Sequence, residues 1–563
     1  MDHLFLEITL VLALATALGI AARALKQPTL LGYIVTGLIV GPLGLMRLNN
    51  ADVIDTMAQF GIAFLLFLVG MEMNFAELKH VGRPALKIAG GQILFSSVVG
   101  LMIALLLGFE WIPALYVAVT LTFSSTIIVV KLLSEKKALD SLYGKIVIGI
   151  LLVQDFIALG VLILLSGMSG PGLDPARLPL TLLATFAKGA ALLVAALAIG
   201  KYVMPRLLHR LAGSQETLFL ASLTWGLGVA ALASLPQIGL SLEIGAFMAG
   251  VALAESVEHY QIMSRVKSLR DFFAVMFFIV LGSKMVLGGG GEVWGATIIL
   301  SAFVLIGNPI IVMALMAKLG YRPRTAFMAG VTVAQISEFS LIVVTLGHRL
   351  GHIDQRVVST VTGVGLITIV LSSYLVLYSE WLYERFAPYV TAVWPRSHAE
   401  KRVGRPPLNG HVVLIGCHRM GHNILHSLME MKREFLVVDF NPDVVARLHR
   451  RGIDAIYGDI TDPDIQDMAA LDRARVVIST VPSLQESMNL IERVKGSGGK
   501  AKIIVTAESE FDALTLYEKK ADYVALPHFI GGLQLARILE EDRALGTLEK
   551  LRAQDMAVIT EHP

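Results

Sequence analysis

Long apolar runs, broken by short polar segments, make up nearly all of the chain before residue 381. A helix needs about 20 mostly apolar residues to cross a bilayer. Cutting the runs at their polar and Pro/Gly breaks gives about thirteen candidate spans. They lie at residues 4–24, 28–46, 56–75, 84–108, 112–133, 143–167, 179–204, 216–235, 239–255, 268–288, 293–317, 323–347 and 356–380. The pattern therefore predicts a polytopic α-helical membrane domain over residues 1–383.

The content of Lys and Arg alternates between successive predicted loops. Every second loop is rich in them: Arg23 and Lys26; Lys79 and Arg83; Lys136 and Lys137; Arg206 and Arg210; Arg265, Lys267 and Arg270; Arg322 and Arg324. The loops at 108–113, 167–175, 235–239 and 288–291 contain neither residue. Because Lys and Arg concentrate in cytoplasmic loops, we expect the N-terminus outside and the C-terminus in the cytoplasm.

After a predicted linker at residues 384–407 the pattern changes to that of a soluble domain. Short apolar runs at 411–415, 435–438, 476–479, 502–505 and 523–525 alternate with amphipathic stretches such as 443–451 and 484–496. This alternation is typical of a doubly wound parallel sheet. We therefore expect an α/β Rossmann-like domain at residues 408–545, followed by a C-terminal tail at 546–563.

The composition agrees with this division. Of 563 residues, 55% are hydrophobic and 16% are charged, which is too apolar for an ordinary soluble protein. A net charge of +2, with no basic stretch interleaved with aromatics, argues against a nucleic-acid partner. The single cysteine, Cys417, excludes internal disulfides and CxxC metal sites, and it suits a domain in a reducing compartment.

Asp155 is the most informative residue of the membrane domain, because it lies near the middle of its predicted span. A carboxylate at that depth costs about 2.5 to 3.5 kcal/mol on insertion scales, so it should face a wet cavity, a cation or a proton relay. Loss of water also disfavours the charged form, so that a cation and a proton can compete for one charge. The alternative is a structural ion pair with Lys145 or Lys284. Gln154, beside it, offers either a neutral carbonyl ligand or a helix–helix hydrogen bond.

Two polar clusters interrupt other spans, TFSST at residues 122–126 and QISEF at residues 335–339. Unwound backbone is tolerated at membrane depth only beside a cavity or within protein. The clusters therefore predict two broken helices, related as inverted repeats, that cross at the substrate site. In the alternative, their hydroxyls bond to carbonyls one turn back in unbroken helices. Glu338 is a second intramembrane carboxylate, with a role in ion binding, in an ion pair or in packing.

Six stretches together resemble the Kef-type potassium/proton antiporters of the monovalent cation:proton antiporter-2 family. They are LGYIVTGLIVGPLG at 31–44, FLVGME at 67–72, SST at 124–126, LVQD at 152–155, GAFMAGVALAES at 245–256 and QISEF at 335–339. The resemblance covers nearly the whole chain. It implies thirteen helices and a core domain that moves against a dimerisation domain in a homodimer.

The same resemblance implies that K⁺ or Na⁺ binds at Asp155, assisted by Gln154 and by the crossover residues Ser124, Ser125 and Thr126. Electrogenic relatives have two adjacent aspartates where this chain has Gln154 and Asp155, which implies electroneutral exchange. We therefore expect a multi-pass protein of a bacterial-type inner (plasma) membrane, with the bilayer, K⁺ (or Na⁺) and H⁺ as its partners.

The chain departs from the family pattern at two places. Relatives usually carry a lysine about where Asn308 stands in LIGNP at 305–309, and that lysine is thought to pair with the core carboxylate. Asn308 is therefore a further candidate residue of the ion site, and Lys284 is either a substitute for the lysine or a side chain that reaches to the membrane interface. Kef systems also carry an acidic regulatory loop, whereas residues 259–270 here are net basic.

The C-terminal domain contains a candidate phosphate-binding turn, GCHRMG at residues 416–421, between a predicted strand and a helix. Glycines at such a turn let backbone N–H groups approach a phosphate, although His418 replaces the middle glycine of the fingerprint. Asp439 ends the next predicted strand, where an acidic residue accepts hydrogen bonds from ribose hydroxyls.

The stretches YGDIT at 457–461, STV at 479–481 and LP at 526–527 resemble signatures of the potassium-transport nucleotide-binding domain, also called the RCK N-terminal domain, over residues 411–540. The resemblance implies a regulatory adenine nucleotide, such as AMP, ATP or NADH. The candidate ligand residues are Gly416, Cys417, His418, Arg419, Met420, Gly421, Asp439, Asp459, Ile460 and Thr480. The alternative is a degenerate Rossmann domain used only for dimerisation.

These features favour a secondary antiporter that exchanges a monovalent cation, K⁺ by resemblance, for H⁺. The alternative is a nucleotide-gated, channel-like K⁺ efflux protein or a membrane sensor. The sequence contains no selectivity-filter loop of the Thr-Val-Gly-Tyr-Gly kind. We do not expect an enzyme, because no catalytic acid or base accompanies the nucleotide fold.

Overall fold

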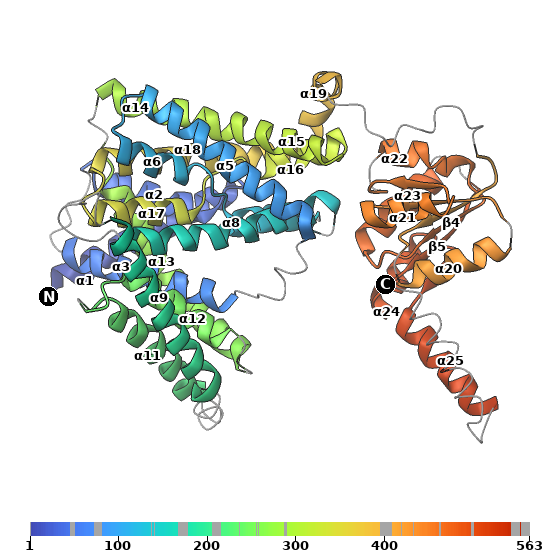
Figure 1. Ribbon diagram of the computed structural model, residues 1–563, viewed down its shortest axis with the longest axis horizontal. Helices are drawn as coiled ribbons and strands as arrows, with labels where there is room; N and C mark the ends of the chain where they lie inside the picture. The colour runs from blue at the N-terminus through green and yellow to red at the C-terminus, as the bar shows by residue number, and fades with distance from the viewer. Residues whose placement is uncertain are drawn as a thin grey trace. The chain divides into compact units, whose positions relative to one another are not determined.

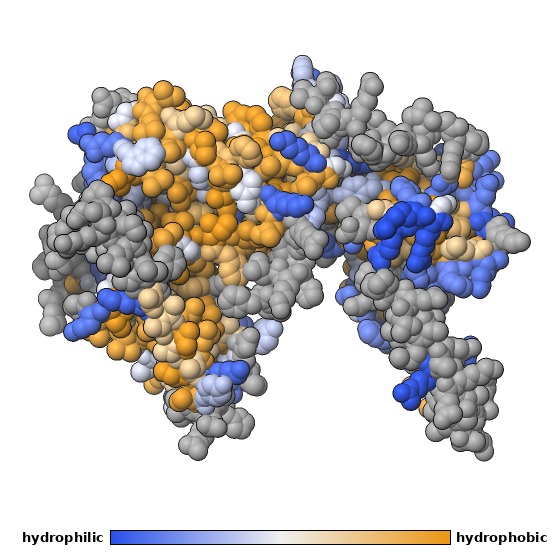
Figure 2. All heavy atoms as spheres, viewed as in Figure 1, coloured by the Kyte–Doolittle hydropathy of each residue, from blue (hydrophilic) through white to orange (hydrophobic). Residues whose placement is uncertain are grey.

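The computed structural model divides the chain into two compact units, formed largely by residues 1–395 and 396–563 (Figure 1). The structure describes residues 2–44, 51–72, 82–136, 138–139, 141–166, 178–204, 215–235, 237–254, 256, 258–286, 290–393, 408–417, 419–431, 433–460, 463–496, 500–541 and 552. On the face drawn in Figure 2, hydrophobic side chains dominate the surface of the first unit and hydrophilic ones that of the second. The surface of the first unit is thus suited to lipid and that of the second to water.

The thirteen predicted spans are confirmed, each as a helix or an interrupted helix. Ten are single helices: α1 (Asp2–Ala24), α2 (Thr29–Val40), α3 (Ala51–Glu72), α5 (Gly82–Leu106), α8 (Leu142–Ser166), α9 (Leu178–Tyr202), α11 (Gln215–Ala233), α12 (Leu242–Leu253), α13 (His259–Ser283) and α18 (Gln355–Leu377). Three are interrupted: α6 and α7 (Trp111–Thr120, Thr126–Glu135), α14 and α15 around a π-helical turn (Gly290–Ala302, Phe303–Gly307, Asn308–Lys318), and α16 and α17 (Pro323–Thr332, Glu338–Arg349). The first and last of these breaks fall at the two predicted clusters.

Two helical segments differ from the sequence-based expectation. Helix α13 begins at His259, nine residues before the predicted span, so Arg265 and Lys267 also lie within a helix rather than in a loop. Helix α19 (Ser379–Val393) occupies the beginning of the predicted linker. Both segments mix charged and apolar residues at helical spacing, a pattern that a search for continuous apolar runs does not detect.

The helices of the first unit pack as two groups. The panel group consists of α1, α2, α3, α9, α11, α12 and α13, and the core group of α5–α8 and α14–α18. Glycines bring α3 and α12 of the panel group into backbone contact, because a Cβ on Gly250 would lie 2.0 Å from the carbonyl oxygen of Phe67. The family-like stretches at 67–72 and 245–256 thus meet at one helix crossing.

The second unit is a parallel six-stranded sheet with helices between the strands. Its strands are β1 (Val412–Ile415), β2 (Phe435–Asp439), β3 (Ala455–Tyr457), β4 (Val476–Ser479), β5 (Lys502–Thr506) and β6 (Tyr523–Ala525), in the order β3-β2-β1-β4-β5-β6. Its helices are α20 (Arg419–Glu430), α21 (Pro442–Arg450), α22 (Pro463–Met468), a 3₁₀ turn (Leu471–Arg473), α23 (Leu484–Gly496), α24 (Glu510–Glu518) and α25 (Pro527–Glu541). This is the strand order of the Rossmann fold. The predicted Rossmann-like fold is confirmed, although β3 was not among the five predicted apolar runs.

Asp522 stabilises the β5–β6 edge of this sheet. Burial alone would raise its pKa, but hydrogen bonds from Lys502, Lys495 and the Ile503 N–H hold the pKa of this carboxyl well below its usual range. A carboxyl whose pKa is lower in the folded state stabilises the fold above its unfolded pKa of about 3.9, and this contribution is lost as the pH falls.

We expect Asp522→Asn to lower the free energy of unfolding of this domain by about 1 kcal/mol at pH 7, since screening by solvent weakens such pairs. The effect should shrink as the pH falls below about 4, where unfolded carboxyls protonate. Pulse proteolysis in urea on the full-length protein, with thermolysin at pH 7 and pepsin at about pH 2, measures both values. Asp472→Asn, at an exposed carboxylate 3.8 Å from Arg473, is the matched control. Equal effects of Asp522→Asn at both pH values would contradict this account.

Candidate functional sites

Two unwound segments meet in the core group, one between α6 and α7 and the other between α16 and α17. Ser125 caps α7 by accepting from the Ile128 N–H at 3.3 Å, and Ser337 caps α17 by accepting from the Phe339 N–H at 3.2 Å. Two hydroxyls join the segments. Ser124 Oγ donates to the Val333 carbonyl at 2.8 Å, and Ser340 Oγ donates to the Thr120 carbonyl at 2.6 Å. The two broken helices therefore contact each other at their breaks, which the sequence predicted from their polar clusters.

Amide side chains satisfy the backbone groups that these breaks expose. The Ser124 N–H donates to Gln154 Oε1 at 3.0 Å, and the carbonyl oxygens of Thr122 and Leu121 accept from Gln92 Nε2 at 3.1 Å and from Asn308 Nδ2 at 2.9 Å. Unpaired backbone groups are costly at membrane depth. This buried amide network therefore stabilises the unwound segment.

This network bears on two predicted ion ligands. Both polar atoms of the Gln154 amide are engaged, since its Nε2 also donates to Gln92 Oε1 at 2.8 Å. Of the two alternatives for Gln154, the structure therefore shows the helix–helix hydrogen bond. Asn308 is 1% exposed and also accepts from Ser96 Oγ at 2.7 Å. In this arrangement both amides brace the broken helix.

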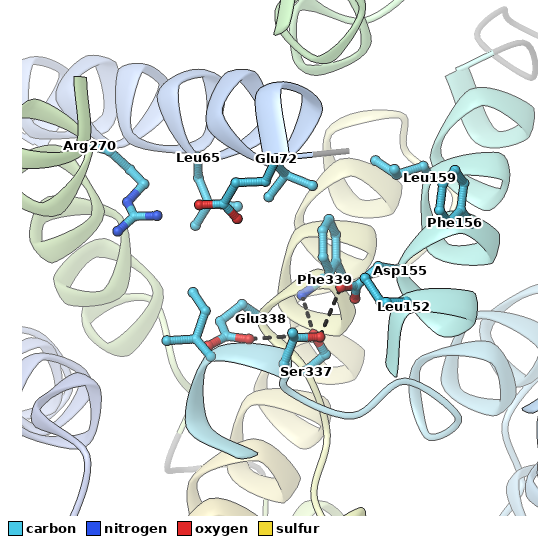
Figure 3. A pocket seen from close by; sticks show the side chains of 13 residues that line it. Leu65, Glu72, Leu152, Asp155, Phe156, Leu159, Arg270, Ser337, Glu338 and Phe339 are labelled. Carbon is cyan, nitrogen blue, oxygen red and sulfur yellow. Dashed lines mark hydrogen bonds between the residues drawn. The ribbon is translucent and has the colours of Figure 1, made fainter. Parts of the chain in front are cut away.

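Asp155 lines a cavity between the core and panel groups (Figure 3). About 120 Å³ of this cavity admits water-sized molecules, enough for several waters. The described lining consists of Leu65, Val69, Glu72, Thr126, Ile127, Leu152, Asp155, Phe156, Leu159, Arg270, Ser337, Glu338 and Phe339. Thr126 Oγ1 donates to Asp155 Oδ2 at 2.8 Å. A carboxylate and a hydroxyl oxygen thus lie together at a cavity large enough for water.

Glu338 is the second core carboxylate at this cavity, and it is 7% exposed. It accepts hydrogen bonds from Ser125 Oγ at 2.9 Å and Ser337 Oγ at 3.4 Å. As the first residue of α17, it also lies at the positive end of a helix. Glu338 thus accepts hydrogen bonds from two hydroxyls. In the described part of the chain, Asp155 accepts one side-chain hydrogen bond, from Thr126.

The panel group contributes two charged residues that the sequence did not assign to the site, Glu72 and Arg270. Glu72 ends α3, and its position at the end of an apolar span was a usable signal. Arg270 was counted with a basic loop, although the predicted span at 268–288 already contains it.

Neither lysine considered as a partner of Asp155 fits that role. Lys284 forms an ion pair with Asp55 and is half exposed. Lys145 lies on the same helix as Asp155 but ten residues earlier, or about 15 Å along the axis. The structure therefore argues against both structural pairings.

An ion pair joins the two helical groups away from the cavity. Arg349 Nη1 of α17 lies 3.0 Å from Glu243 Oε1 of α12, whose side chain is 6% exposed. Glu338 and Arg349 are the first and last residues of α17, so this contact lies about 16 Å along that helix from the cavity. The cavity thus separates the two groups at the first residue of α17, and the ion pair joins them at its last residue.

In the second unit, the turn after β1 has the geometry of a phosphate-binding loop. Gly416 has a φ of +81°, and Thr480 Oγ1 donates to its carbonyl at 2.9 Å. A Cβ on Gly421 would lie 2.0 Å from the same carbonyl oxygen, so only glycine allows this approach of α20 to the strand. The turn lies between the ends of β1 and β4, where the strand order reverses and where such folds bind ligands.

Asp439, at the end of β2, organises this turn. Its carboxylate accepts from the Cys417 N–H at 2.7 Å and from the Asn441 N–H at 2.8 Å. An acidic residue at the end of this strand is where a Rossmann fold accepts hydrogen bonds from ribose hydroxyls. Burial, and then the negative charge of Asp439, raise the pKa of the Cys417 thiol to about 11.

The remaining predicted nucleotide ligands fall in different places. Ile460 is 5% exposed and its side chain packs in the hydrophobic core, so this residue can reach a ligand only through its backbone. Asp459 follows β3 at the same edge of the sheet as Asp439. Arg419 and Met420 begin α20. His418 lies outside the described residues.

Comparison with known proteins agrees with both units. Residues 9–377 match the family described as sodium/hydrogen exchanger, transmembrane, and residues 412–527 match the TrkA-N domain. An Escherichia coli (strain K12) protein named “Putative cation/proton antiporter YbaL” is 26% identical over 539 residues, 94% of this chain and 95% of that protein. The sodium proton antiporter MjNhaP1 from Methanocaldococcus jannaschii, solved at pH 8, is 15% identical over 70% of this chain and 99% of that one, with a TM-score of 0.50. This last likeness confirms the fold of the membrane unit.

The state of Cys417 gives a direct test of the turn. With a pKa of about 11, about 0.1% of the thiol is ionised at pH 8. We expect iodoacetamide to modify native protein at least 100-fold more slowly than urea-unfolded protein, because the thiolate is the nucleophile. Mass spectrometry reads the result cleanly, since the chain has one cysteine. Ser427→Cys in a Cys417→Ala background, on the exposed face of α20, is the reactive control. Rapid labelling of native Cys417 would contradict this burial.

Proposed function

The chain belongs to the sodium/hydrogen exchanger family and is a cation/proton antiporter, and from this premise we propose that Asp155 is the group that binds the cation and the proton in turn. The observation that carries the proposal is the position of Asp155, a mid-span carboxylate in a cavity between two packed helical groups. A single carboxylate can neutralise either one monovalent cation or one proton. Exchange at this site is therefore one for one and electroneutral.

Thr126 is the second cation ligand in this proposal, and Glu338 contributes negative charge near the ion. The Thr126 hydroxyl can turn its oxygen lone pairs to a cation when it releases Asp155. Ser124 and Ser125 act through the crossing of the broken helices, since their hydroxyls bond to the Val333 carbonyl and to Glu338. Gln154 and Asn308 keep the first break open through the amide network.

We propose K⁺ as the cation. The family-like stretches favour it, and in this proposal the bound ion keeps some of its water, for which the cavity has room. Removing part of the hydration shell costs less free energy for K⁺ than for Na⁺, because Na⁺ holds its water more tightly. The selectivity then follows from incomplete ligation of the ion by protein oxygens.

Transport requires that the cavity be open to one side at a time. We propose that the core group moves against the panel group as a rigid body, as in transporters built from inverted repeats. The Glu243–Arg349 ion pair supports this scheme, since it joins the groups about 16 Å from Glu338 along α17. In the complementary state this ion pair would break.

The setting we propose is a bacterial inner membrane, with the N-terminus outside and the C-terminal domain in the cytoplasm. The alternation of Lys- and Arg-rich loops supports this orientation. We also propose a homodimer, which the family-like stretches imply.

For the C-terminal domain we propose a regulatory adenine nucleotide. Support comes from the Rossmann strand order, the glycine turn at Gly416 and Gly421, and Asp439 at the end of β2. The phosphates would accept hydrogen bonds from backbone N–H groups at the start of α20, where the helix dipole favours negative charge. Binding would change the exchange rate without chemical change to the nucleotide.

Asp155→Asn should abolish exchange, because an amide cannot bind a proton and a cation in turn. The measurement is alkalinisation of acid-loaded proteoliposomes, read by a pH dye, when external K⁺ or Na⁺ is added. We expect a signal in the wild type, with K⁺ the better substrate, and the level of protein-free liposomes in the variant. Glu135→Gln, at an exposed carboxylate on α7, is the matched control. Exchange that persists in Asp155→Asn would overturn the role of Asp155.

Thr126→Val should weaken cation binding, while Thr126→Ser should retain it. Loss of a hydrogen bond to a charged group costs about 1.5 to 3 kcal/mol, which corresponds to a rise in the apparent KM for the cation of about tenfold or more. Initial rates of exchange at several cation concentrations give the KM. A normal KM in the valine variant would remove Thr126 from the cation site.

Nucleotide binding is tested with Gly421→Ala in the full-length protein. The added methyl group must displace the Gly416 carbonyl and distort the turn, and loss of one charge-assisted hydrogen bond weakens binding about tenfold or more. Equilibrium dialysis with AMP, ATP and NADH measures the affinity. Gly531→Ala, at a helix position with no atom near its Cβ, is the control. No binding of these nucleotides to the wild type would favour a domain used only for assembly.

A further inference from the structure

Helix α19 leaves three aromatic side chains exposed just after the last membrane span. Trp381 is 64% exposed, Phe386 46% and Tyr389 73%. At 3.6 residues per turn these three side chains fall within a sector of about 140° around the helix, and Glu384, which is also exposed, falls outside that sector. A group of exposed aromatic side chains on one face marks a surface that contacts an apolar partner.

This aromatic face follows the exposed side of α18 along the chain. Leu371, Tyr374 and Tyr378 are exposed at successive turns at the end of that span, where exposed apolar side chains face lipid. Helix α19 begins at the next residue, Ser379, and lies beside α16 (Figure 1). Because a membrane span ends near the surface of the bilayer, α19 begins at that surface.

Other side chains of α19 attach it to both broken helices of the core group. Glu380 Oε2 lies 2.6 Å from Arg324 Nη2 at the start of α16, and Ser379 Oγ accepts from Lys136 Nζ at 2.6 Å just after α7. Both contacts lie at the ends of α7 and α16 that are remote from the breaks, or about 15 Å along each ten-residue helix. The exposed aromatics take no part in them, so they remain available to a partner outside the core group.

We propose that α19 lies in the surface of the bilayer and anchors the adjoining ends of α7 and α16 at that level. Trp381, Phe386 and Tyr389 lie at the boundary between headgroups and acyl chains, where Trp and Tyr are enriched because their rings have an apolar body and a polar tip. Arg385, on the same side of the helix, extends its guanidinium to the headgroups.

The composition of α19 identifies the kind of lipid surface. The helix carries two glutamates and one arginine, so it lacks the cluster of basic residues that binds anionic headgroups. Insertion of aromatic rings supplies the binding instead, and a bilayer of neutral lipids is sufficient. The inference does not depend on which ion binds at Asp155.

The test is the depth of α19 in the full-length protein, measured by spin-label EPR in phosphatidylcholine vesicles. Cys417→Ala removes the single cysteine of the chain, and a nitroxide is then attached at Trp381→Cys, Phe386→Cys, Tyr389→Cys or Glu384→Cys. Oxygen concentrates in lipid, whereas the nickel complex Ni-EDDA stays in water. The ratio of their collision rates with the nitroxide therefore reports its depth, and Glu384→Cys is the matched control on the same helix.

We expect this ratio to be several-fold higher for the three labels on the aromatic face than for the label at position 384. Frequent collisions of these three labels with Ni-EDDA would place the aromatic face in water and overturn the proposal. Few collisions with either reagent would show that protein covers this face, from a second copy or from another part of the chain, and would also overturn it.

The anchoring role is tested by removing aromatics while the label stays at Tyr389→Cys. We expect Trp381→Ser together with Phe386→Ser to raise the collision rate with Ni-EDDA several-fold, and Glu384→Gln, the control, to leave it unchanged. If the double variant is not monodisperse on size-exclusion chromatography, Trp381→Ser alone should give a smaller shift in the same direction. A label that keeps its depth in a folded variant would show that contacts with α7 and α16 alone hold α19, and would contradict the anchor.

Discussion

A carboxylate inside a bilayer must have water, hydrogen-bond donors or an opposite charge near it, and this requirement shapes the membrane unit around Asp155. The requirement is met by a cavity rather than by a lysine, because Lys284 pairs with Asp55 and Lys145 lies far along the helix. The broken helices in turn need this cavity or the surrounding protein beside them, since unwound backbone is tolerated at membrane depth only there. The site and the fold therefore depend on the same constraint.

The broken helices raise a second requirement, that of satisfying their exposed backbone groups. Gln92, Gln154 and Asn308 meet it from three different helices. These amides are buried and engaged, whereas Asp155 keeps the cavity beside it. The three amides therefore stabilise the unwound segment, while Asp155 lines the cavity where the ion is proposed to bind. Substitution of a supporting amide should disturb the whole site, because an unpaired group at this depth is costly.

Hydropathy and motif spacing predicted most of the architecture. Continuous apolar runs revealed the spans, and the clusters at 122–126 and 335–339 revealed the breaks, because these signals are local in sequence. The spacing of strands and glycines likewise predicted a Rossmann-like parallel sheet and the turn at Gly416.

Contacts between residues far apart in the chain could not be predicted in this way. The hydrogen bond from Gln154 to Gln92 and the ion pair between Glu243 and Arg349 each join two separate helices. Charged residues hid the start of α13, residues 259–267, from a search for apolar runs. Ile460 resembled a ligand by its motif, but its side chain packs in the core. In each case the tertiary packing decided the role.

The central claim, that one carboxylate serves the cation and the proton in turn, is tested most directly by competition. The measurement is the apparent KM for K⁺ at a series of pH values, from initial rates of exchange in proteoliposomes. If both ions bind Asp155, the KM should rise about tenfold for each unit of decreasing pH where the proton-loaded form dominates, with the maximal rate unchanged. A KM that does not depend on pH, with protons altering only the maximal rate, would show that the two ions bind at different groups and would contradict the account.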